Sequence, residues 1–94
     1  MTERVWSIFN QDDRLVLALS DEPGEVNFTR LPEDGTLPVR CAFATLQCYD
    51  SKTEPEILNN LMRAADLEDF LARLKKGGFK IRTGRPKPYK FARL

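Results

Sequence analysis

The sequence predicts an α+β fold: an antiparallel sheet of about four N-terminal strands, two helices, and a C-terminal basic β-hairpin. Three observations lead to this prediction. Residues 1–53 are acidic and rich in alternating β-forming side chains, residues 54–76 place apolar side chains at helical spacing, and residues 77–94 alternate apolar with basic side chains. A chain of 94 residues is long enough for one hydrophobic core, so we expect residues 1–94 to form a single domain.

Residues 4–9 and 14–20 predict the first two strands. β-Forming side chains dominate both segments, with Trp6 and Ile8 sharing one face of the first and the leucines sharing one face of the second. The break between the two segments, residues 10–13, is short and consists of polar turn formers. Short breaks of this kind join antiparallel neighbours, so the two strands are predicted to form a hairpin.

Residues 25–30 predict a third, shorter strand, and residues 39–49 predict the longest one. Both faces of the long strand are largely apolar, so we expect it to be central in the sheet and the most buried strand. Cys41 and Cys48 would then face opposite sides, about 23 Å apart at 3.3 Å per residue. This spacing favours two buried structural thiols over a disulfide or a metal site.

Residues 54–76 predict two helices rather than one. Thr53 is a candidate N-cap, and Glu56 stands three residues later, as a capping box requires. The apolar side chains of residues 57–65 and those of residues 67–74 would lie on opposite sides of one straight helix. A break between the two sets resolves this conflict, with Asp66 as the N-cap of the second helix.

The C-terminal part of the chain carries the strongest charge asymmetry. Residues 1–53 have nine acids and five bases, whereas residues 70–94 have nine bases and no acid. Residues 79–83 and 89–94 predict two short strands around a stiff loop, residues 84–88, which contains two prolines. A block of one charge sign favours an anionic partner or a solvated tail. The predicted binding residues are Arg73, Lys80, Arg82, Arg85, Lys87, Tyr89, Lys90 and Arg93.

Two segments resemble parts of known DNA-binding families. The Gly-Arg-Pro sequence at residues 84–86 resembles the centre of an AT-hook, which implies insertion into the minor groove of A·T-rich DNA. The order of elements over residues 54–94 resembles the later part of a winged-helix domain, which implies a second helix in the major groove and a wing at residues 84–88. That helix would begin with Asp-Leu-Glu-Asp at residues 66–69, whose acids repel phosphates, so we do not assign the chain to this family.

The composition argues against catalysis. The chain has no histidine, which excludes Ser-His and Cys-His pairs and imidazole metal ligands, and it has no glycine-rich phosphate-binding motif. We therefore expect no enzymatic activity, no cofactor and no metal site. The longest apolar run has five residues, whereas a membrane span needs about 20. The first residues lack the pattern of a signal peptide, so we expect a cytoplasmic protein without a membrane partner.

These observations favour a small non-catalytic binding protein whose basic C-terminal hairpin contacts nucleic acid, either DNA or RNA. The alternative is a protein–protein inhibitor or adaptor, for example a phage or mobile-element accessory protein that docks on a host nucleic-acid-handling complex. The small size and the absence of catalytic motifs fit both. The sequence does not distinguish the two partners, and it indicates neither a sequence preference nor an oligomeric state.

Overall fold

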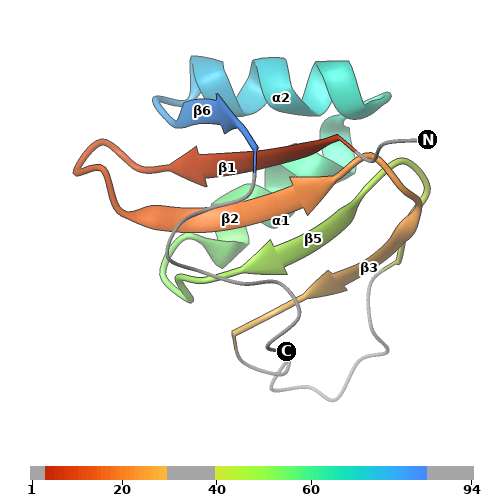
Figure 1. Ribbon diagram of the computed structural model, residues 1–94, viewed down its shortest axis with the longest axis horizontal. Coiled ribbons are helices and arrows are strands. Elements are labelled where there is room, and N and C mark those ends of the chain that lie inside the picture. The colour runs from red at the N-terminus through yellow and green to blue at the C-terminus, as the bar shows by residue number, and fades with distance from the viewer. Residues whose placement is uncertain (1–3, 30–39, 85–94) are drawn as a thin grey trace.

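The computed structural model describes residues 4–29 and 40–84. Within these residues a sheet of six strands is covered on one face by two helices, which lie on the far side of the sheet in Figure 1. The strands are β1 (Val5–Phe9), β2 (Leu15–Ser20), β3 (Gly24–Asn27), β4 (Arg40–Cys41), β5 (Thr45–Cys48) and β6 (Lys80–Thr83). The helices are α1 (Glu54–Arg63) and α2 (Leu67–Lys76). The predicted α+β class and the two helices are confirmed.

The strand order is β4-β3-β5-β2-β1-β6, and the sheet is mixed. β3 runs parallel to β5, with Val26 opposite Leu46, whereas the other neighbours pair antiparallel. The predicted hairpin of β1 and β2 is present, with Ile8 opposite Leu17. The prediction of a fully antiparallel sheet was wrong because residues 39–49 do not form one strand.

Residues 42–44 break the predicted long strand into β4 and β5. These residues carry the chain across the start of β3. Cys41 pairs with Gly24 at one edge of β3, and Leu46, the residue after Thr45, lies opposite Val26 at the other edge. A Cβ on Gly24 would collide with the Thr45 hydroxyl, which donates a hydrogen bond to the Glu22 carbonyl at 2.8 Å. The missing side chain of glycine therefore permits this close crossing, which makes β5 parallel to β3.

The core lies between the sheet and the helices. On the helix-facing side of the sheet, Ile8 pairs with Leu17, and Leu19 pairs with Leu46, so apolar side chains form a continuous row across the strands. The helices contribute Ile57, Leu61, Phe70 and Leu74. All eight side chains are buried. Burial of apolar surface is the main stabilising contribution to such a fold.

The most buried strand is β2 and not the predicted segment 39–49. Every residue of β2 is buried. β2 lies between β1 and β5, so both of its edges are paired, and apolar residues occupy both of its faces. In segment 39–49, the bend leaves Ala42 exposed and Phe43 half-buried, while Ala44 is completely buried. β5 still occupies a central position, third in the sheet order.

The break between the two helices occurs where it was predicted. The Asp66 carboxylate accepts a hydrogen bond from the Asp69 amide at 2.8 Å, which caps α2. The predicted capping box of α1 is absent. Thr53 occupies the N-cap position without a side-chain cap bond, and its amide, which Glu56 would bind, donates instead to the Asp50 carbonyl at 3.1 Å. A local turn thus satisfies the donor that the motif would have used.

The two cysteines are buried and free, but they do not face opposite sides of one strand. The bend at residues 42–44 removes the strict alternation between Cys41 and Cys48, and both side chains join the same core cluster. Burial raises the pKa of the Cys48 thiol to about 12, with a smaller contribution from the Glu54 carboxylate. Cys48 is therefore a neutral core side chain at physiological pH.

Candidate functional site

The predicted binding surface lies only partly within the described residues. Three of its eight side chains are described: Arg73, Lys80 and Arg82. The others, which are Arg85, Lys87, Tyr89, Lys90 and Arg93, lie outside the described residues. The same holds for the second strand of the predicted basic hairpin. Of the three described side chains, Lys80 and Arg82 belong to β6 and Arg73 belongs to α2.

A glycine turn positions β6 directly after α2. Gly78 has a φ of +98°, a left-handed conformation that glycine adopts without strain and that helix ends commonly use. Phe79 follows it and is buried in the core, which fixes the start of the strand. β6 then pairs antiparallel with β1. The pairing partner of this strand within the described residues is therefore the first strand of the chain.

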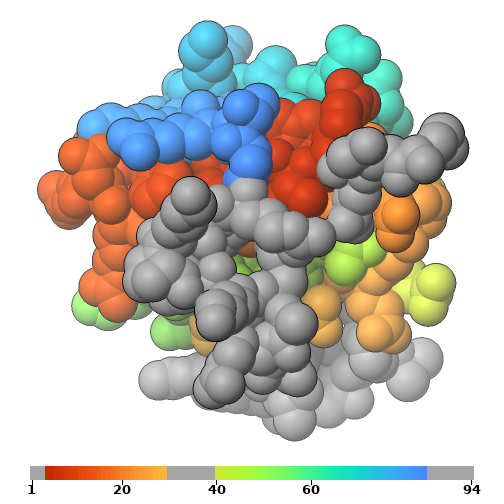
Figure 2. All heavy atoms as spheres, in the orientation of Figure 1, coloured from red at the N-terminus to blue at the C-terminus, as the bar shows by residue number. Residues whose placement is uncertain are grey.

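The pairing with β1 determines which β6 side chains reach solvent. Ile81 lies opposite Ile8 and packs on the core, so Lys80 and Arg82 project from the opposite face of the sheet, where both are exposed. Phe9 lies opposite Lys80 and therefore shares this face. Figure 2 shows β6, in blue, at the surface of this face beside β1, in red.

Lys80 is bound to a carboxylate of the β1–β2 turn. Its Nζ donates to Asp13 Oδ1 at 2.7 Å, and both side chains are at least half exposed. Asp13 has a φ of +62°, and the Asn10 side chain stabilises the turn by accepting hydrogen bonds from the Asp12 and Arg14 amides. The hydrogen bond from Lys80, together with its charge, holds the pKa of Asp13 below its usual range.

Arg82 covers an aromatic ring of the neighbouring strand. Its guanidinium carbon lies 5.1 Å from the centroid of the half-buried Phe9 ring, within the range of a cation–π contact. Phe9, Asp13, Lys80 and Arg82 therefore lie together at one corner of the sheet. We refer to these four residues as the β6 cluster.

Hydrogen bonds hold the end of β6 against β1. The Gly84 amide donates to the Val5 carbonyl at 2.7 Å, and the buried Ser7 hydroxyl donates to the Gly84 carbonyl at 2.7 Å. Gly84 has a φ of +102°, which disfavours other residues even though the space around it is open. Gly84 is the only described residue of the Gly-Arg-Pro sequence, and it serves as a turn at the end of the strand.

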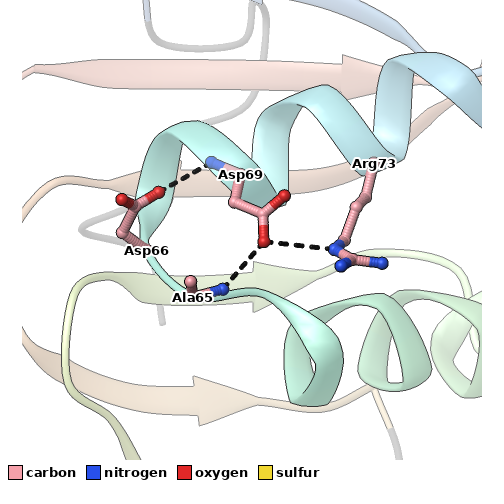
Figure 3. Close-up of polar contacts among 4 residues, drawn as sticks. All are labelled: Ala65, Asp66, Asp69 and Arg73. Atoms are coloured by element: carbon pink, nitrogen blue, oxygen red, sulfur yellow. Dashed lines mark hydrogen bonds and ion pairs between the residues drawn. The ribbon is translucent and has the colours of Figure 1, made fainter.

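Arg73 does not join the β6 cluster. Figure 3 shows its side chain reaching toward the junction of α1 and α2, where its Nε lies 3.3 Å from Asp69 Oδ2. The same carboxylate oxygen accepts the Ala65 amide at 2.9 Å. The hydrogen bond from Ala65, and next the one from Arg73, lowers the pKa of Asp69. Arg73 therefore supports the helix junction, and the Asp66 and Asp69 carboxylates at the start of α2 accept backbone amides.

Sequence reasoning missed two members of the cluster, Phe9 and Asp13. Asp13 and Lys80 are 67 residues apart, and only the pairing of β1 with β6 brings them together. Alternation in residues 4–9 separates Phe9 from the face that Trp6 and Ile8 share. This alternation contained no signal for the partner strand, because it indicates on which face of a strand a side chain lies and not which other strand pairs with it.

The described residues place few other reactive groups near one another. Within residues 4–29 and 40–84, no group of three or more cysteine or carboxylate side chains is arranged to hold a metal ion. Neither described helix is long and apolar enough to cross a membrane. Comparisons with protein-family models, curated proteins and solved structures give no match for this chain.

Proposed function

We propose that this protein is a non-catalytic nucleic-acid-binding protein whose contact surface begins at β6 and continues into the basic C-terminal segment. One observation carries the proposal. The exposed Lys80 and Arg82 project from one face of the sheet beside an aromatic ring, at the start of a segment with six bases and no acid, residues 80–94. Cations beside an aromatic group are suited to a polyanion that carries flat bases.

The arrangement of the charges supports this proposal over a uniformly solvated surface. Asp66 and Asp69 accept backbone amides at the start of α2, and the Asp69 carboxylate also binds Arg73. The bases after Gly78 follow the other end of this helix. Gly84 fixes the end of β6 against β1 through the Val5 carbonyl. The basic segment therefore starts from a defined point at the end of β6, two residues after Arg82.

The proposal is tested by fluorescence anisotropy with labelled mixed-sequence DNA and RNA over a series of salt concentrations. The double variant Arg85→Ala with Lys87→Ala should weaken binding to all sequences alike and reduce the slope of log affinity against log salt by roughly 1–2 units. Arg63→Ala, at the far end of α1, removes one exposed base and serves as the control that should leave the slope unchanged. A larger loss on A·T-rich than on G·C-rich duplex would identify residues 84–86 as a minor-groove reader.

Undetectable binding of the parent protein to DNA and RNA at about 50 mM salt would contradict the proposal, because electrostatic binding is strongest at low salt. A defined protein complex recovered with nuclease present would then favour the inhibitor or adaptor function.

A further inference from the structure

We infer that the β6 cluster binds single-stranded nucleic acid, with Phe9 as the stacking platform and Asp13 as an internal competitor for the phosphate-binding lysine. This inference rests on the proposed function and specifies its substrate class. It assigns a role to each of the four side chains at this corner of the sheet: Phe9, Asp13, Lys80 and Arg82.

The first step of the argument concerns Phe9. An aromatic side chain at the protein surface can stack only on a base whose flat side is accessible, and in a duplex that side is covered by neighbouring base pairs. Phe9 is half-buried, so its position is defined by the sheet, and Arg82 lies over its ring at 5.1 Å. Stacking of a base on an aromatic ring is generally stronger than an exposed cation–π contact. A base is therefore expected to replace Arg82 over the ring.

The second step concerns the two cations. When a base occupies the Phe9 ring, the Arg82 guanidinium becomes available to the adjacent phosphate, with which it forms paired hydrogen bonds. Lys80 lies opposite Phe9 in the strand pairing and on the same face, close to the same nucleotide. One aromatic ring on β1 and two cations on β6 thus match the alternation of base and phosphate along a single-stranded nucleic acid.

The third step concerns Asp13. Its carboxylate binds Lys80 Nζ at 2.7 Å, in the position that a phosphate oxygen would take. The pair is exposed, with 50% of the Lys80 side chain and 65% of the Asp13 side chain accessible, and ion pairs of this kind are weak. A phosphate can therefore displace Asp13, but it must compete with a carboxylate that is already in place. Removal of this carboxylate should strengthen binding.

The turn geometry provides a clean substitution for Asp13. Its φ of +62° is unfavourable for most side chains, but asparagine, like aspartate, adopts this conformation. Asp13→Asn therefore removes the charge and keeps the turn. Asp12→Asn is the matched control, because it removes the same charge one residue away, and Asp12 has no ion pair with Lys80.

The experiment measures anisotropy with a fluorescent oligo(dT) single strand and with a mixed-sequence duplex of the same length, at about 50 mM salt. The parent should prefer the single strand. Phe9→Leu should weaken single-strand binding roughly fivefold or more and leave duplex binding unchanged, while Phe9→Tyr should retain binding. Asp13→Asn should raise the affinity severalfold more than Asp12→Asn does. Circular dichroism verifies that each variant is folded.

Each part of the inference has its own contrary result. Equal parent affinity for both oligonucleotides, with no effect of Phe9→Leu, would overturn the single-strand assignment and leave the proposed function intact. Equal effects of Asp13→Asn and Asp12→Asn would show that Asp13 acts only through net charge, which overturns its role as a competitor. Absence of parent binding to either oligonucleotide would remove the proposed function and this inference together.

Discussion

β2 and β6 are the two neighbours of β1 in the sheet (Figure 1), and their side chains differ strongly in exposure to solvent. β2 and β6 both run antiparallel to β1. All six residues of β2 are buried, whereas three of the four residues of β6 are exposed and Ile81 is half-buried. β2 lies between β1 and β5, with apolar residues on both faces, whereas β6 is the last strand in the described sheet order and carries basic side chains. Backbone bonds hold β6 in place, so its outward side chains are free to serve a partner.

This comparison can be tested with two residues that flank the same side chain. Leu17 of β2 and Ile81 of β6 both lie opposite Ile8. Leu17→Ala should lower the free energy of unfolding by about 2–5 kcal/mol, because it leaves a cavity in a fully buried row. Ile81→Ala should cost less than half as much, because part of this side chain is already in contact with water.

Urea denaturation of the two variants, followed by tryptophan fluorescence, measures both costs, since Trp6 is buried in the same core. Equal costs would contradict the comparison. β6 would then contribute to the core as much as β2 does. Substitutions of its exposed cations would then change stability as well as binding.

The same contrast explains what the sequence could predict. Local patterns identified the first two strands, the split between the helices and the alternation of apolar with basic side chains in β6, because alternation and helical periodicity report which face of an element is buried. They did not identify the mixed sheet. The bend at residues 42–44 depends on the close approach of Thr45 to Gly24, a contact between segments about 20 residues apart that no local pattern encodes.

The candidate site also depends on contacts between distant segments, which local sequence patterns do not encode. The basic residues were visible in the sequence as a charge block, but their environment was not. Asp13 occupies a turn and was explained fully by turn chemistry, and Phe9 was one of several aromatic strand residues. Their relation to Lys80 and Arg82 arises only from the register of β1 with β6, which is set by the burial of Ile81 against Ile8.

The N-cap residues of the two helices give a prediction of intermediate size. It tests whether the side-chain capping bond expected from the sequence contributes to stability. Asp66 caps α2 through its carboxylate, whereas Thr53 occupies the N-cap of α1 without a side-chain cap bond. Asp66→Ala should therefore lower the free energy of unfolding by about 1 kcal/mol, and Thr53→Ala should lower it less. Thermal unfolding monitored by circular dichroism compares the two. A larger loss for Thr53→Ala would mean that its hydroxyl bond to the Asp50 carbonyl, at 3.0 Å, stabilises α1 more than a cap does.

The smallest expected effect on stability is that of Arg82→Ala. The Arg82 side chain is exposed, and its contact within the cluster is the cation–π interaction with Phe9, which at exposed sites contributes about 0.5–1 kcal/mol at most. The variant should therefore unfold within about 1 kcal/mol of the parent, and Arg63→Ala on α1 should behave similarly. If Arg82→Ala lost as much stability as Leu17→Ala, a loss of nucleic-acid binding in that variant would follow from unfolding of β6. A stable variant with weakened binding instead separates the two neighbours of β1 into one strand that maintains the core and one that contacts the partner.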